Sequence, residues 1–203
     1  MKALFENLFL YEIILLFLGV IFFLLLCAML YRNYTSDKPF TGLLKFFLLP
    51  IIMIAYPSIK SVQIGDWKLE MERAKVAVSS NPEDNLAIKQ LTEITEKLQK
   101  RAKTPEDILS IGQAKFLLGD SKEAIKFADE AITVSLENAD NPKDKVIKES
   151  ATQLKQLANF QQEVKNGRDT HLLQEGVAEM EVIDPNSRLY IENKFKINEG
   201  LGY

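Results

Sequence analysis

The residues best suited to chemistry in this chain form a basic cluster near its middle. Lysine and arginine side chains recognise anions, and arginine suits the bidentate recognition of phosphate. Basic residues at the end of a helix also complement the negative end of its dipole, so a purely structural role stays open. If the cluster binds a ligand, we expect an anion site with contributions from two later arginines. The candidate ligand-binding residues are Lys97, Lys100, Arg101, Lys103, Arg168 and Arg188.

The residues that catalysis usually requires are scarce. The chain has one histidine, His171, and one cysteine, Cys27, so a zinc site of the usual His/Cys kind and a Cys–His nucleophile pair are not available. The histidine has no nucleophile-elbow motif near it, and the glycines form neither GxxxxGK nor GxGxxG. We therefore expect a protein that is not an enzyme, with no catalytic residues, no metal site and no cofactor.

An apolar run near the start of the chain predicts a membrane span. Residues 13–31 contain no charged side chain, and nineteen residues of helix reach roughly 28 Å, close to the thickness of a bilayer core. A cleaved signal peptide is the alternative, but Glu6 and Glu12 precede the run and no small-x-small cleavage site follows it. We therefore expect a retained anchor.

A second, shorter apolar run covers about residues 43–59 and contains Pro50 and Pro57. We expect a short second span, and a re-entrant or interfacial segment is the alternative. Five basic residues in the N-terminal tail and after the second run oppose three in the loop between the runs. The positive-inside rule then places both termini in the cytoplasm, in the inner (cytoplasmic) membrane.

The rest of the chain, residues 61–203, is long enough for one cytoplasmic domain with its own core. It holds 20 Lys and Arg against 25 Asp and Glu. This acidic balance argues against nonspecific binding of long nucleic acid. The absence of cysteine outside the first apolar run agrees with a reducing compartment.

Residues 61–72 alternate between apolar and polar side chains around a Gly-Asp pair, which predicts a β-hairpin. An amphipathic segment lying on the membrane surface is the alternative. A second hairpin is predicted at 179–197, around Asp184-Pro185-Asn186-Ser187. We expect the two hairpins to pair and to bring the C-terminal segment back beside the membrane-proximal linker.

Helices are expected between these hairpins. Asn81, Thr104 and Asn141 each precede a proline, an arrangement in which the polar residue caps a helix and proline occupies its first position. Apolar residues recur every three or four positions after these starts. The predicted helices cover residues 82–102, 105–118, 121–138 and 142–166.

Residues 105–138 resemble a tetratricopeptide repeat. Ile111-Gly112 stand at the leucine-glycine pair of that family, followed by Phe116, then Gly119 at the turn, and Ala124 and Ala131 in the second helix. The aromatic residue expected in the second helix is displaced to Phe127. The resemblance implies a helical scaffold of the kind that binds peptides or partner proteins.

The sequence thus predicts a membrane-anchored, mainly α protein: one or two N-terminal transmembrane helices, then a cytoplasmic domain of about four antiparallel helices flanked by short β-hairpins. Two functions are open. One is an adaptor that recognises a protein partner and couples it to the membrane segment. The other is an effector that binds a small anionic nucleotide and opens or disrupts the bilayer. In layout alone the chain is similar to the membrane effectors of type III CRISPR defence, which cyclic oligoadenylate gates. We expect a homo-oligomer in either case.

Overall fold

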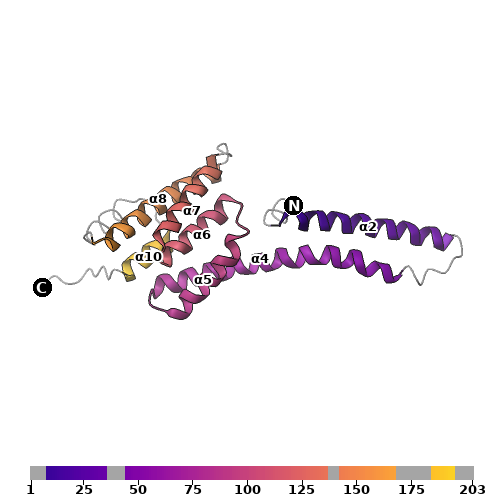
Figure 1. Cartoon of the computed structure of the whole chain (residues 1–203), viewed down its shortest axis with the longest axis horizontal. Helices are drawn as coiled ribbons and strands as arrows, with labels where there is room; N and C mark the ends of the chain where they lie inside the picture. Colours follow the sequence, from indigo (N-terminus) through magenta and orange to yellow (C-terminus); the bar gives the residue numbers. More distant parts are fainter. Residues whose placement is uncertain (1–7, 36–43, 137–141, 168–183, 195–203) are drawn as a thin grey trace. The chain divides into compact units, whose positions relative to one another are not determined.

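The computed structural model describes residues 8–35, 44–136, 142–167 and 184–194, and these residues divide into two units (Figure 1). The first unit extends to Asp66 and the second begins at Trp67. The described residues are helical, with no β-strand among them. One helix, α4 (Leu48–Ser80), contributes residues to both units.

The first unit contains α2 (Leu10–Thr35), the short 3-10 helix η1 (Lys45–Phe47) and the first part of α4. Gly19 lies at a close approach of α2 and α4, because a Cβ atom there would come within 2.9 Å of the Met53 Cβ atom. Small residues permit such close packing between apolar helices. In this chain Gly19 therefore serves packing between α2 and α4 of one molecule.

Two helical segments of the first part of the chain are long and apolar enough to cross a membrane, judged by length and composition. They are Leu10–Thr35 and Lys45–Ser80. Few residues are buried in the most apolar 18-residue stretch of each segment: 11% in the first segment and 17% in the second. An apolar helix whose side chains are mostly uncovered is better suited to a lipid environment than to water.

The β-hairpin predicted at 61–72 is wrong, because α4 continues without interruption through these residues. Ile64, Met71 and Val78 are buried at intervals of seven, which places them on one side of a helix. Val62 and Leu69 belong to the apolar alternation and yet are exposed, at 67% and 61%. Residues 68–78 are rich in good helix formers, and the single Gly65 does not outweigh them.

The described residues of the second unit form the end of α4 and five further helices. The helices expected at 82–102, 105–118, 121–138 and 142–166 correspond to the first four of them, and residues 137–138 lie outside the described residues. The five are α5 (Asn85–Gln99), α6 (Pro105–Leu117), α7 (Ser121–Leu136), α8 (Pro142–Lys165) and α10 (Pro185–Lys194).

Local capping explains where these helices begin. The Thr104 hydroxyl accepts a hydrogen bond from the Asp107 amide, with Pro105 at the first helical position, as expected. For α5 the expected cap was Asn81, but Asp84 performs this role by accepting hydrogen bonds from the amides of Leu86 and Ala87. A carboxylate at this position also meets the positive end of the helix dipole.

Helices α6, α7 and α8 pack side by side and form the core of the second unit (Figure 1). Gly112 of α6 faces both neighbours: a Cβ atom there would be 3.0 Å from Leu154 of α8 and 3.3 Å from Phe127 of α7. Buried alanines complete the contact on the other two helices, and they are Ala124, Ala128, Ala131, Ala151 and Ala158. Small side chains at these positions allow three helices to meet closely.

The C-terminal hairpin is also wrong for its described part, because residues 188–192 lie inside α10. Asp184 begins this helix by accepting hydrogen bonds from the Ser187 amide and hydroxyl, with Pro185 at the first position. Residues 179–183 and 195–197 lie outside the described residues. The C-terminal segment reaches α4, but at its far end: the Asn193 side chain donates to the carbonyls of Ser79 and Ser80.

Substituting Gly112 by leucine is expected to destabilise the second unit. A large side chain at this contact forces α7 and α8 apart, and such overpacking costs about 1–3 kcal/mol. The melting temperature of the full chain in detergent, followed by circular dichroism, measures the effect.

Gly65→Ala is the matched control, since nothing lies within 4 Å of a Cβ atom at Gly65. This change removes a glycine from a helix interior and should leave stability unchanged or raise it by up to about 1 kcal/mol. Equal melting temperatures for Gly112→Leu and the unchanged chain would contradict the close packing.

Candidate functional site

A groove between α4 and α5 is the best candidate for a binding site among the described residues. Helix α5 runs back along α4, and the space between them has a volume of about 410 Å³, within the size range of small-ligand sites. One wall comes from α4 and the other from α5. The lining residues are Glu70, Arg73, Ala74 and Ala77 of α4 with Gln90, Glu93, Ile94 and Lys97 of α5.

The groove is amphipathic and carries both signs of charge. Each wall contributes one cation and one carboxylate: Arg73 and Glu70 from α4, Lys97 and Glu93 from α5. Ala74 and Ile94 are buried and form its apolar floor. Such a surface can receive an apolar side chain at its base while its rim pairs with charges of either sign.

Trp67 lies next to Lys97 of the groove. The Lys97 ammonium stands 5.8 Å from the centroid of the indole ring, a cation–π arrangement. The next residue along α4, Lys68, forms an ion pair of 2.6 Å with Asp107 in the first turn of α6. These two contacts hold both sides of the α5–α6 connection beside the start of the second unit.

Four of the six residues predicted to bind an anion lie close together in sequence and structure. We call Lys97, Lys100, Arg101 and Lys103 the basic turn. Lys97 lines the groove, and Lys100 caps the C-terminus of α5. Arg101 and Lys103 lie in the connection to α6.

The other two predicted residues do not extend this site in the described structure. Arg188 lies on α10 and forms an ion pair of 3.0 Å with Glu192 of the same helix. Arg168 lies outside the described residues. An anion site composed of all six residues stays a prediction.

Sequence reasoning missed Arg73 and Trp67 as site residues. The sequence pattern favours a strand or a membrane-surface segment for the tryptophan, and the arginine counts only among the basic residues that indicate the membrane topology. Reading residues 61–80 with a helical period places positions 67, 70, 74 and 77 on one face, which is the face that meets α5. This helical repeat is the sequence signal that indicates the α4 wall of the groove.

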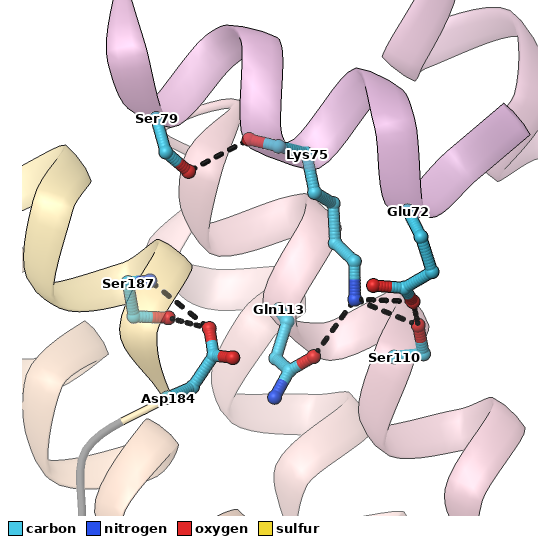
Figure 2. A network of polar contacts seen from close by, with 7 residues as sticks. All are labelled: Glu72, Lys75, Ser79, Ser110, Gln113, Asp184 and Ser187. Atoms are coloured by element: carbon cyan, nitrogen blue, oxygen red, sulfur yellow. Dashed lines mark hydrogen bonds and ion pairs between the residues drawn. The ribbon is translucent and has the colours of Figure 1, made fainter. Parts of the chain in front are cut away.

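A buried lysine fixes α4 to α6 beside this site (Figure 2). The Lys75 side chain is 3% exposed, and its ammonium lies 2.7 Å from a Glu72 carboxylate oxygen. The ammonium also donates to the Ser110 hydroxyl and to the Gln113 side-chain oxygen, both at 3.0 Å. A protonated lysine has three N–H donors, so these three acceptors satisfy it completely. The Ser110 hydroxyl in turn donates to Glu72.

A second buried network joins α10 to the three-helix core. Gln161 of α8 accepts a hydrogen bond of 2.6 Å from the Ser121 hydroxyl, and its amide nitrogen contacts the Phe116 carbonyl and the Tyr190 hydroxyl. The Tyr190 ring packs edge-on against that of Phe116. Burial raises the pKa of Tyr190 above its ordinary value of 10.0, and the hydrogen bond with Gln161 partly offsets this effect.

The described residues contain no group of three or more histidine, cysteine, aspartate or glutamate side chains arranged to hold a metal ion. His171, the only histidine, lies outside these residues. The charged side chains that line the groove can form ion pairs and hydrogen bonds, and the Trp67 ring beside Lys97 offers an aromatic face.

Replacing Lys75 with methionine is expected to lower the free energy of unfolding by about 1–3 kcal/mol, because two half-buried acceptors and a carboxylate lose their donor. Glu72→Gln should cost less than about 1 kcal/mol, since the Glu72 side chain is 53% exposed and water can replace it. Chemical denaturation of the full chain in detergent, followed by helical circular dichroism, measures both. Equal losses would contradict the role of Lys75 as the buried centre of the network.

The raised pKa of Tyr190 predicts a loss of stability in alkali. Because the folded state holds the phenol proton more tightly than the unfolded state, stability is complete below pH 10 and declines as pH rises from about 10 toward the folded pKa. Melting temperatures across this range should fall more steeply for the unchanged chain than for Tyr190→Phe, which cannot ionise. Parallel curves would exclude Tyr190 as a source of the decline.

In comparisons with known proteins, no family model, no curated protein and no solved structure matches the chain. The tetratricopeptide resemblance of residues 105–138 stays a prediction, as does the similarity in layout to CRISPR membrane effectors.

Proposed function

We propose that this chain is a non-enzymatic, membrane-anchored recognition protein whose α4–α5 groove binds a partner protein and couples it to the membrane segment. The observation that carries this proposal is that the two halves of α4 have different surroundings. Its first half belongs to an apolar segment long enough to cross a membrane, and its second half forms one wall of the groove. A partner that contacts the groove therefore contacts the same helix that enters the bilayer.

The charges of the groove favour a protein partner over a free anion. A phosphate-bearing ligand held between Arg73 and Lys97 would also meet the carboxylates of Glu70 and Glu93. Repulsion between the phosphate and these carboxylates disfavours binding. A peptide carrying both signs of charge and one apolar side chain satisfies all four groups and the floor. Helical segments laid in grooves of this kind bind through such alternating contacts.

A nucleotide-gated effector is the second candidate, and one observation favours it. Trp67 offers an aromatic face for a base, with the Lys97 ammonium 5.8 Å from its centroid as a partner for a phosphate. In this function the messenger binds at the end of the groove that is closest to the basic turn. The consequence is a change in how α4 packs in the bilayer.

The recognition function predicts two results for the full chain expressed in cells. The chain should stay in the membrane pellet after extraction with alkaline carbonate, which releases peripheral proteins. A photo-crosslinking amino acid at Ala77, an exposed residue of the groove wall, should yield a discrete adduct with one partner protein.

Two controls make the second result specific. The same crosslinker at Lys122, an exposed position on α7 away from the groove, should not yield that adduct. Gln90→Trp fills the groove from the opposite wall and should abolish the Ala77 adduct while the melting temperature stays unchanged. An adduct that survives Gln90→Trp, or a chain that carbonate releases, would exclude this function.

A further inference from the structure

A strongly charged surface lies where α4 enters the second unit, and the groove does not account for most of it. The basic turn carries four cations within seven residues, and only Lys97 lines the groove. We propose that the basic turn docks on the phosphate headgroups of an anionic lipid surface. This proposal rests on the membrane anchoring proposed above and assigns a second contact with the bilayer.

Two contacts place the basic turn beside the first residues of the second unit. Lys97, at the start of the turn, stands over the Trp67 ring. Asp107, shortly after the turn, pairs with Lys68 at 2.6 Å. The connection between α5 and α6 is therefore held at both ends against two consecutive residues of α4.

The length of chain between this point and the apolar segment limits how far the turn can lie from the bilayer. Eight positions separate Ile59, near the end of the apolar run, from Trp67. Along a helix such as α4 this is about 12 Å, and even a fully extended chain spans at most about 29 Å. If Ile59 lies at the edge of the hydrocarbon core, the headgroup layer, about 5–7 Å thick, covers about half of the ~12 Å between Ile59 and Trp67.

The remaining distance is within the range of membrane electrostatics. The Debye length is about 8 Å at physiological ionic strength, so the basic turn feels the surface potential of an anionic leaflet. Trp67 also belongs to the residue type that prefers the membrane–water interface. The second half of α4 contributes Lys68 to the same end of the unit, where it forms an ion pair with Asp107.

The lipid and a soluble phosphodiester share one chemistry, because both present negatively charged phosphate oxygens to lysine and arginine. Position favours the lipid. The basic turn is tied to residues that follow the apolar segment closely, so lipid phosphates are present at a high effective concentration without any diffusing ligand. Binding to a fluid lipid surface also requires no enclosed pocket, so the cations of the basic turn are suited to it.

The test uses the full chain with Cys27→Ser and a nitroxide attached to Ala102→Cys, within the connection between α5 and α6. It is reconstituted in nanodiscs of phosphatidylcholine alone or mixed with phosphatidylglycerol, each with a trace of nickel-chelating lipid. We expect stronger nickel relaxation of the nitroxide in the anionic discs. Raising the salt from about 0.1 M to about 1 M shortens the Debye length from about 10 Å to about 3 Å and should remove the difference.

Lys100→Glu with Lys103→Glu should abolish the lipid-dependent relaxation, with about a fivefold loss of the docked population for each basic residue removed. Lys145→Glu with Lys148→Glu is the matched control: it makes the same charge change on exposed positions of α8 and should leave the relaxation unchanged. Circular dichroism melting curves verify that both variants fold. Equal relaxation in the two kinds of disc, or equal effects of the two variants, overturns the proposal.

Two further outcomes separate the possible failures. If cyclic oligoadenylate raises the melting temperature in phosphatidylcholine discs, Lys100→Glu with Lys103→Glu removes this shift, and anionic lipid has no effect, the basic turn binds the soluble ligand and lipid docking is overturned. If the chain does not remain in either kind of disc during purification, the anchoring on which both proposals rest has failed. Retention in discs without lipid-dependent relaxation overturns docking alone.

Discussion

A buried ammonium group must find an acceptor for each of its three N–H bonds, and this requirement governs how the second unit is assembled. Lys75 meets it with one carboxylate from its own helix and two side chains from α6. Each acceptor fixes the rotation and the axial position of α4, because a shift of one residue would leave a charge buried without partners. The register of α4 on α6 is therefore fixed by hydrogen-bond geometry as well as by the packing of its buried apolar side chains.

That register determines where the groove and the basic turn lie. With Lys75 directed toward α6, the neighbouring positions Arg73 and Ala77 are left to face the groove with α5. Farther toward the start of the unit, Trp67 and Lys68 meet opposite sides of the α5–α6 connection. The groove and the basic turn are thus two consequences of one fixed helix.

Features specified by local chemistry were predictable from the sequence, and features specified by distant contacts were not. The starts of α6 and α8 follow from a proline at the first position, and the turn at Gly119, with its φ of +77°, follows from a glycine. The apolar side chains of residues 61–72 fit the two-residue repeat of a strand, but those at positions 64 and 71 also lie two turns apart on one side of a helix. Only burial against other helices distinguishes the two structures. In the same way Arg73 carries no signal of its own until Lys97, more than twenty residues later, is placed opposite. Asp184-Pro185 repeats the pattern that begins the other helices, but the β-prone residues that follow it favoured a strand.

The capping of α4 by Asn193 has a consequence for biosynthesis. The carbonyls of Ser79 and Ser80 at the end of this helix receive hydrogen bonds from Asn193, which lies 114 and 113 positions later. At about 5–20 residues per second, translation takes roughly 6–20 seconds to supply that amide after the end of α4 is made. During this interval the end of α4 lacks these two hydrogen bonds, so its capping is completed only after Asn193 has been synthesised.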